Sequence, residues 1–463
     1  MTDTMLSIAE SWSETTAFHT LDELFAWVAQ RNQNLQVDIC KTSLKKGDFW
    51  FYDPEEGCIR NQNRSFFQII GLERCIDGVS VQTQPVILQQ EIGFLGIICQ
   101  KKNGVMHFLM QAKIEPGNIN KIQISPTIQA TKSNFTQKHG GAKPPYLEYF
   151  EQAAQYEIVV DQIQSEQSSR FYKKRNRNIM IRVDEDVPVL PSHRWMTLAQ
   201  IKQLMRVDNL VNMDTRTVLS CIPFCKLRLV NEDSQRLAGR FSNPALYQSV
   251  FVGDGENHLP EIYQYINNYK MFAEMSEHFV PLHQLDGWRM ADDCIYCEKP
   301  YPYQVIYCDI AIEGREVKRW VQPLFEATGI ATFGLICCEE KGVLKFLVRA
   351  TPELGCFDGI ELGPTIQWEA VPFPGHKETE MDRFFETNLQ AGQGILFNHL
   401  LSEEGGRFYH EQNRNILLQV DLADLPELPD GYFLVDYRTL NELMQVNNTM
   451  NIQLRNLLSL LEA

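Results

Sequence analysis

A short polar stretch contains residue types that transfer protons near neutral pH. Residues 131–139 follow an apolar segment that we expect to be a strand, and they include Ser133 and His139. Histidine titrates near neutrality and can serve as base or acid, and loops that leave a strand often carry function. The alternative for His139 is a surface histidine without a task. Thr131 and Asn134 complete this polar set.

Further candidates for proton transfer and hydrogen bonding precede this stretch. Glu115 could remove a proton, but it stands before a Pro-Gly turn and recurs as Glu353, which favours a structural role or a hydrogen bond to a substrate hydroxyl. Lys113 could donate to a developing negative charge, and a preorganised donor of that kind contributes about 2.7–4 kcal/mol. Its alternative is a solvated lysine on a strand. Gln129 is a candidate for substrate binding.

Two arginines and an asparagine suit a diphosphate ligand. Arg170, Asn176 and Arg177 lie close in sequence, and arginine is permanently charged and can donate two hydrogen bonds at once. The alternative is that these arginines pair with the many carboxylates of the chain. A second pocket would contain Arg349, Gln367, Arg407, Asn413 and Arg414. Trp50 or Tyr52 could stack on an aromatic base, with core packing as the alternative.

The chain repeats itself. Gln84-Pro85 returns 238 positions later as Gln322-Pro323, and many single residues across the following block keep that offset without a gap. Arg170-Phe171-Tyr172 returns 237 positions later as Arg407-Phe408-Tyr409. Chance does not produce so many matches in register, so the protein is a duplication.

The pattern within each repeat indicates an α+β fold. Residues 93–100 and 105–112 predict two strands joined by a Lys-Asn-Gly turn. Helices are expected after the capping pattern Thr20-x-x-Glu23, over 145–156 and over 197–221. Strands followed by helices favour a mixed sheet flanked by helices in each repeat. The expected organisation is a first repeat over 1–230, a connector over 231–258 and a second repeat over 259–463.

Composition narrows the class of protein. The formal charge of −16 argues against a nucleic-acid partner, although a local arginine pocket can still bind a small anion. No run of eighteen apolar residues predicts a membrane span, and the polar N-terminus lacks the pattern of a signal peptide. Twelve cysteines in such a chain fit reduced thiols in a cytoplasm. Cys294-x-x-Cys297 lacks a second ligand pair, which favours buried sulfur over metal binding.

Three motifs, each present twice, resemble those of the NDP-hexose 2,3-dehydratases: Gln-Pro, Phe-Leu-x-x-Ala-x-x-Glu-x-Gly and Pro-Thr-x-Gln. The resemblance covers residues 21–461 and is most specific over 115–141. It implies a Nudix-like fold for each repeat, a homodimer, no metal and no organic cofactor. It also implies that a dTDP-4-keto-6-deoxyglucose loses water to give the 3,4-diketo-2,6-dideoxy sugar in deoxysugar biosynthesis. The chain departs from this family at Phe135, where a tyrosine is expected.

The sequence gives independent support for the absence of a Nudix-type metal site. The nearest approach to a Nudix box is Arg315-Glu316, and no pair of glutamates follows it. Magnesium held in that way needs clustered carboxylates. Hydrolysis of a pyrophosphate by the Nudix mechanism is therefore not expected.

The chemistry of the implied substrate defines the groups that an active site would need. A base at C3 would contribute roughly 10²–10⁴-fold, donors must meet the charge on O4, and an acid must protonate the departing C2 hydroxyl. Copy one carries the richer set, because Trp368 begins a segment without a Ser-Asn pair and His376 is at most a remnant of His139. We therefore expect one active pocket, in copy one. The rivals are a nucleotide-sugar-binding protein without turnover and a 3-epimerase of the same sugar.

Overall fold

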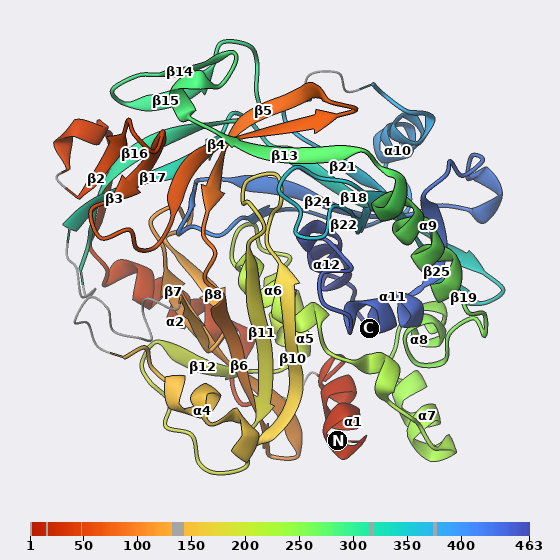
Figure 1. Ribbon diagram of the computed structural model, residues 1–463. Coiled ribbons are helices and arrows are strands. Elements are labelled where there is room, and N and C mark those ends of the chain that lie inside the picture. Colours follow the sequence, from red (N-terminus) through yellow and green to blue (C-terminus); the bar gives the residue numbers. More distant parts are fainter. Residues whose placement is uncertain (1, 15–16, 48, 132–142, 314–318, 374–376) are drawn as a thin grey trace.

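The computed structural model describes residues 2–14, 17–47, 49–131, 143–313, 319–373 and 377–463 (Figure 1). The fold is α+β, as predicted: mixed sheets are flanked by helices. None of the helices within these ranges combines the length and the apolar character that a membrane crossing requires. All twelve cysteines are free thiols.

The central sheet of the first repeat has the strand order β10-β11-β6-β7-β12, with β8 beside β7 and β9 beside β6. The predicted hairpin is confirmed as β6 and β7, and its turn places Asn103 and Gly104 at positive φ of 51° and 84°, the region that glycine and asparagine tolerate best. Strand β6 runs parallel to β11 and pairs Gly96 with Ile179. The strands are β6 (Gly93–Lys102), β7 (Val105–Ile114), β8 (Ile122–Ser125), β9 (Ile128–Ala130), β10 (Glu157–Ser165), β11 (Arg175–Arg182) and β12 (His193–Met196).

The second repeat builds the same sheet from equivalent strands. Its order is β20-β19-β18-β24-β22, with β21 beside β18 and β25 beside β19, and the parallel pair β18 and β24 joins Gly334 to Ile416. A Cβ atom on Gly96 would lie 2.5 Å from the ring of Phe150, and one on Gly334 would lie 2.3 Å from that of Phe385. Both sheets therefore need glycine where a helix packs against them. The strands are β18 (Ala331–Glu340), β19 (Val343–Thr351), β20 (Glu361–Pro364), β21 (Ile366–Trp368), β22 (Ile395–Ser402), β24 (Gln412–Gln419) and β25 (Tyr432–Asp436).

Two smaller sheets exchange strands between the repeats. Strand β1 (Val37–Thr42) of the first repeat pairs with β16 (Tyr303–Ile312) of the second, and β13 (Met275–Val280) of the second pairs with β4 (Gln68–Ile76) of the first. Each repeat therefore completes a sheet of the other. The remaining strands are β2 (Trp50–Asp53), β3 (Cys58–Asn61), β5 (Val79–Leu88), β14 (Trp288–Met290), β15 (Cys294–Cys297), β17 (Arg319–Ala327) and β23 (Phe408–Tyr409).

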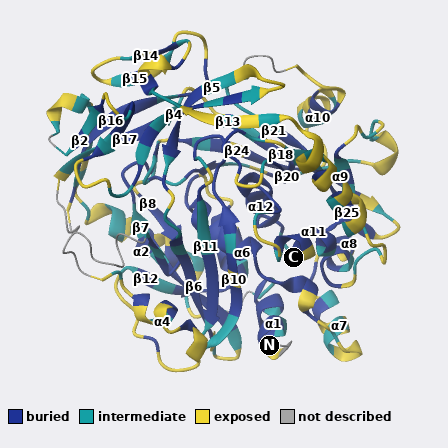
Figure 2. Cartoon of the chain, viewed as in Figure 1, coloured by how far each residue is buried: buried dark blue, intermediate teal, exposed yellow. Residues whose placement is uncertain are grey.

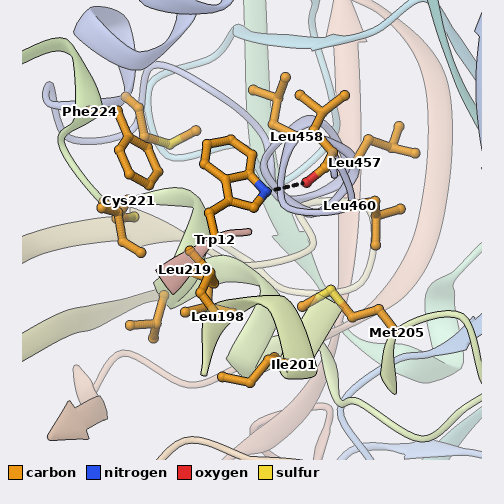
Figure 3. Packing of buried hydrophobic residues seen from close by; sticks show 14 of the residues in the cluster. Trp12, Leu198, Ile201, Met205, Leu219, Cys221, Phe224, Leu457, Leu458 and Leu460 are labelled. Carbon is orange, nitrogen blue, oxygen red and sulfur yellow. Dashed lines mark hydrogen bonds between the residues drawn. The ribbon is translucent and has the colours of Figure 1, made fainter. Parts of the chain in front are cut away.

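Helices from both repeats contribute side chains to one hydrophobic core. The buried residues lie mainly along the central strands and the helices packed against them (Figure 2). Trp12 inserts among α5, α6 and α12 and donates a hydrogen bond from Nε1 to the carbonyl of Leu461 at 3.0 Å (Figure 3). The helices are α1 (Thr2–Ser11), α2 (Leu21–Gln33), α4 (Leu147–Glu151), α5 (Leu198–Leu204), α6 (Met213–Ser220), α7 (Asn231–Ala238), α8 (Pro244–Tyr247), α9 (Leu259–Phe272), α10 (Glu380–Ala391), α11 (Tyr437–Met444) and α12 (Ile452–Leu458).

The predicted helices have mixed outcomes. The capping box is confirmed, since Thr20 and Glu23 exchange hydrogen bonds at the start of α2. The helix expected over 197–221 is wrong: it is two helices, because Asn209 has φ of 58° and Asn212 caps a new start. The helix expected over 145–156 is shorter, because Tyr146 has φ of 62°. Segment 231–258 contains α7 and α8 despite its turn-forming composition.

Candidate functional site

A large cavity of about 1340 Å³ is lined by residues of both repeats. Strand β7 ends at Ile114 and β9 at Ala130, so the side chains at and just beyond these ends face the opening. Lys113, Glu115, Gln129 and Thr131 reach the cavity in this way. The second repeat contributes Asp309, Trp320, Glu404 and Arg407 to the lining.

Three residues predicted from the sequence meet in one hydrogen-bond network. The Lys113 ammonium lies 2.9 Å from Oε1 of Glu115, and Nε2 of Gln129 donates to the same oxygen at 3.0 Å. Asn212, which caps α6, donates to Oε1 of Gln129 at 3.3 Å. Glu115 is buried, so this network holds its carboxylate in one position at the cavity wall.

A second group of charged side chains in the cavity was missed by sequence reasoning. Asp214, at the start of α6, lies beside Glu166, Lys174 and Glu404 in the cavity lining. Burial, together with the charges of Glu166, Glu404 and Glu115, raises the pKa of Asp214 well above its usual range. Burial also raises the pKa of Glu404 to about 7 and lowers that of Lys174 to about 8. Glu404 and Lys174, whose pKa values lie near neutrality, therefore share the cavity lining with Asp214, whose pKa is raised.

One signal for these residues was present in the sequence. Asp214 is the second residue of α6 and Gln453 is the second residue of α12, each two positions after a capping asparagine. Glu404 precedes the repeated Arg-Phe-Tyr triplet by three positions, where the first repeat has Gln167. A search for charges present in only one repeat would have found both acids.

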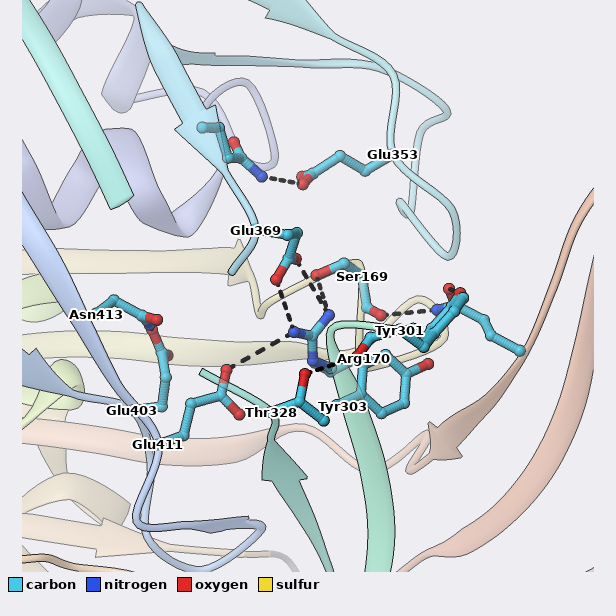
Figure 4. A network of polar contacts seen from close by, with 12 residues as sticks. Ser169, Arg170, Tyr301, Tyr303, Thr328, Glu353, Glu369, Glu403, Glu411 and Asn413 are labelled. Carbon is cyan, nitrogen blue, oxygen red and sulfur yellow. Dashed lines mark hydrogen bonds and ion pairs between the residues drawn. The ribbon is translucent and has the colours of Figure 1, made fainter. Parts of the chain in front are cut away.

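The arginines expected to bind phosphate lie elsewhere. Arg170 is only 1% exposed and forms ion pairs with Glu369 at 3.0 Å and Glu411 at 3.8 Å (Figure 4). Arg177 forms a bidentate pair with Asp161, with both N–O distances at 2.6 Å. Neither arginine lines the large cavity. The carboxylate pairing considered as the alternative is what the structure shows.

Loop exchange explains the position of Arg170. The amide of Gly117 donates to the carbonyl of Gly405 at 2.7 Å, and the amide of Lys173 donates to the carbonyl of Gly355 at 2.7 Å. Each Arg-Phe-Tyr loop thus crosses to the other repeat. Arg170 consequently lies near the second pocket, whereas Arg407, predicted for that pocket, lines the large cavity.

Asn176 reaches the large cavity, as predicted for the first site. Its Nδ2 donates to Glu166 at 2.7 Å, and its Oδ1 accepts from the amide of Gly93 at 3.1 Å. Its counterpart Asn413 is buried and donates to Glu403 at 2.6 Å. These matching hydrogen bonds show that the loop after Glu166 and the loop after Glu403 occupy equivalent positions in the two repeats.

The second pocket measures about 570 Å³ and contains the expected Arg349 and Gln367. Gln367 donates to Glu353 and accepts from Asn451 at 3.0 Å, which repeats the network around Glu115. Asn413 and Arg414 do not line this pocket. Glu369 does, at the place where the first repeat has Thr131.

Aromatic candidates divide between cavity and surface. Trp50 lines the cavity and packs on Phe67 with ring centroids 4.7 Å apart. Tyr52 forms a hydrogen bond with His283 and does not line the cavity. Several predicted positions lie outside the described residues: Ser133, Asn134, Phe135, His139, Arg315, Glu316 and His376.

Comparisons with known proteins agree with this duplicated architecture. The sequence profile of the NDP-hexose 2,3-dehydratase family matches residues 21–222 and again 259–461. A dTDP-4-dehydro-6-deoxy-alpha-D-glucopyranose 2,3-dehydratase of Saccharopolyspora spinosa is 35% identical over 100% of this chain and 94% of its own length. Proteins of the same name are 35% identical in Streptomyces violaceoruber, over 96% of this chain and 97% of theirs, and 32% in Amycolatopsis orientalis, over 96% and 90%.

Proposed function

Because this chain belongs to the NDP-hexose 2,3-dehydratase family, we propose that it eliminates water across C2 and C3 of dTDP-4-keto-6-deoxyglucose. The product is dTDP-3,4-diketo-2,6-dideoxyglucose, an intermediate for deoxysugars. The observation that carries the proposal is full-length identity of 32–35% to relatives named for this reaction. The large cavity, with acids and a lysine on one wall, supplies the groups that the reaction needs.

The carbonyl already on the sugar makes the elimination possible. Removing the proton at C3 sends its electrons toward O4, and re-forming the C4 carbonyl expels the C2 hydroxyl, which leaves as water after protonation. The resulting enol tautomerises to the diketone. We assign proton transfer to the cavity wall that holds Glu115, Lys113 and their neighbours, and keep His139 and Ser133 as catalytic candidates from the sequence.

Substrate binding is assigned to the remaining lining of the cavity. Arg407 and Arg31 are permanent cations there, suited to the diphosphate. The buried Nε of Arg31 has no hydrogen-bond partner among the described residues. Trp50 is a candidate for stacking on thymine, and Gln129, Thr131 and Asn176 for contacts with the sugar; Asn134 keeps that role from the sequence.

The second pocket is proposed to be accessory and without turnover, and the chain to comprise a repeat over 1–230, a connector over 231–258 and a repeat over 259–463. A Nudix-like fold for each repeat and a homodimer belong to the same proposal. Light scattering should give twice the mass of one chain. The mass of one chain would refute the dimer.

One incubation tests the reaction. The purified protein is mixed with dTDP-4-keto-6-deoxyglucose, with and without a chelator, and the products are examined by mass spectrometry. Dehydration predicts the loss of one water in both samples. An unchanged mass with an altered sugar configuration would identify an epimerase, and an unchanged sugar with saturable binding would identify a binding protein.

A further inference from the structure

Acidic side chains from both repeats meet at the wall of the large cavity. Asp214 comes from α6 of the first repeat, and Glu404 comes from the exchanged loop of the second. They are close enough for the charge of Glu404 to act on Asp214. The first repeat alone therefore does not supply every acid that faces this cavity.

The duplication provides an internal comparison for both positions. Asp214 corresponds to Gln453, because α6 and α12 begin with the same asparagine cap. Glu404 corresponds to Gln167, since the adjoining Glu403 and Glu166 accept matching bonds from Asn413 and Asn176. At both places a side chain that ionises is replaced by an amide that does not. Glutamate and glutamine have nearly the same size, so the difference between Glu404 and Gln167 mainly concerns ionisation.

The surroundings of the two acids suit different tasks. Asp214 is 1% exposed, and its Oδ2 has no hydrogen-bond partner within the described part of the chain. Burial and the neighbouring carboxylates raise its pKa well above its usual range, which favours the protonated form, and a neutral carboxylic acid can donate a hydrogen bond to a developing oxyanion. Glu404 is more accessible, and its Oε1 accepts from the amide of Gly406 at 3.1 Å. With a pKa of about 7 it can both accept and return a proton.

We propose that Glu404, supplied by the second repeat, is the catalytic acid–base of the dehydration and that Asp214 donates a hydrogen bond to O4. This inference rests on the proposed function. The Glu404 carboxylate takes the C3 proton, the C–H electrons form the enolate, and Asp214 stabilises the charge on O4. The C4 carbonyl then re-forms, the C2–O bond breaks, and Glu404 gives its proton to the departing hydroxyl. Water leaves and both carboxyl groups return to their starting state.

The test compares Glu404→Gln with Glu403→Gln. Both changes neutralise an acid in the same loop, but Glu403 is buried against Asn413 and does not line the cavity. Glu404→Gln should lower turnover by about 100-fold or more and should equally slow exchange of the C3 hydrogen in D₂O. The Kd of the 4-keto sugar nucleotide should stay within about threefold of that of the unaltered protein, because the substitution removes no binding contact. Glu403→Gln should keep turnover if it folds.

The outcomes separate this inference from the proposed function. If the unaltered protein releases no water, the function itself fails. If it does and Glu404→Gln retains turnover, or loses turnover while still exchanging the C3 hydrogen, the assignment of Glu404 is overturned. Should Glu404→Gln not fold, Glu404→Asp must shift the pH profile of kcat; an unchanged profile would reject the assignment. Asp214→Asn keeps a donor and should retain more turnover than Asp214→Leu; equal losses would reject the role of Asp214.

Discussion

The two cavities of this protein share a framework and differ in their ionisable groups. In both, a glutamate after a strand is held by a glutamine, which is in turn held by the asparagine that caps a helix. Around this common network, Lys113, Asp214 and Glu404 line the first cavity, and the duplication places Thr351, Gln453 and Gln167 at the corresponding positions. The shared residues maintain the architecture, and the differing residues locate the chemistry.

The two sides also differ at Arg170 and Arg407, which the duplication relates to each other. Arg407 faces the large cavity, where its Nη2 donates to Oε1 of Gln89 at 3.1 Å. Arg170 is locked between Glu369 and Glu411. The same residue type therefore binds ligand in our proposal on one side and stabilises the fold on the other.

The largest expected effect comes from replacing each of these two arginines in turn. Arg170→Met should lower the free energy of unfolding by about 3–5 kcal/mol, because Glu369 loses the counter-charge that a buried arginine supplies. Arg407→Met should instead leave stability nearly unchanged and raise the KM. Urea denaturation and steady-state kinetics of both variants check this, and equal loss of stability would remove the distinction between the two sides.

A second experiment concerns three candidate residues that lie outside the described ranges: Ser133, His139 and His376. His139→Ala and Ser133→Ala should reduce turnover, because both belong to the polar set predicted for the active cavity, whereas His376→Ala should not. The three variants are compared by product formation at saturating substrate. Equal losses at His139 and His376 would contradict the proposal of a single active cavity.

A smaller effect on turnover is expected when a residue of the first cavity is replaced by its counterpart in the second repeat. Lys113→Thr introduces the residue of the second repeat and removes the cation 2.9 Å from Glu115, so turnover should fall by about tenfold, near 1.4 kcal/mol. Thr351→Ala is the matched control and should keep kcat. An unaltered kcat in Lys113→Thr would show that this lysine is structural.

The smallest effect is a pH-dependent gain in stability at Glu411, which lies 3.8 Å from Arg170. Burial raises the pKa of Glu411 from 4.5 to about 8. Between these values the folded state keeps a proton that the unfolded state has released, so stability falls as pH rises through this window. Glu411→Gln removes that loss and should gain on the order of 1 kcal/mol at pH 8, and less at pH 5. Melting curves at both pH values check it; a gain larger at pH 5 would reverse the sign.

Much of the framework could be predicted from the sequence, because repetition and hairpin signals are local. The duplication predicted two equivalent folding units. Lys113, Glu115 and Gln129 were each candidates from the sequence, and the structure brings them to one wall. Strand exchange could not be predicted, since alternation within β1 tells which face is buried and not which edge it joins. The misplaced role of Arg170 and the missed Glu404 share that cause: each lies on a loop that crosses to the other repeat. The broken helix at Asn209 required knowledge of its backbone conformation.

Strand exchange has a consequence for how the protein is made. Val37 pairs with Ile312, so a ribosome must synthesise about two thirds of the chain before β1 finds its partner. Until then the edges of β4 and β1 are unpaired, and open edges of this kind invite association with other chains. The first repeat therefore cannot complete its folding before the second is synthesised. We expect nascent chains to depend on chaperones that bind exposed sheet edges until translation ends.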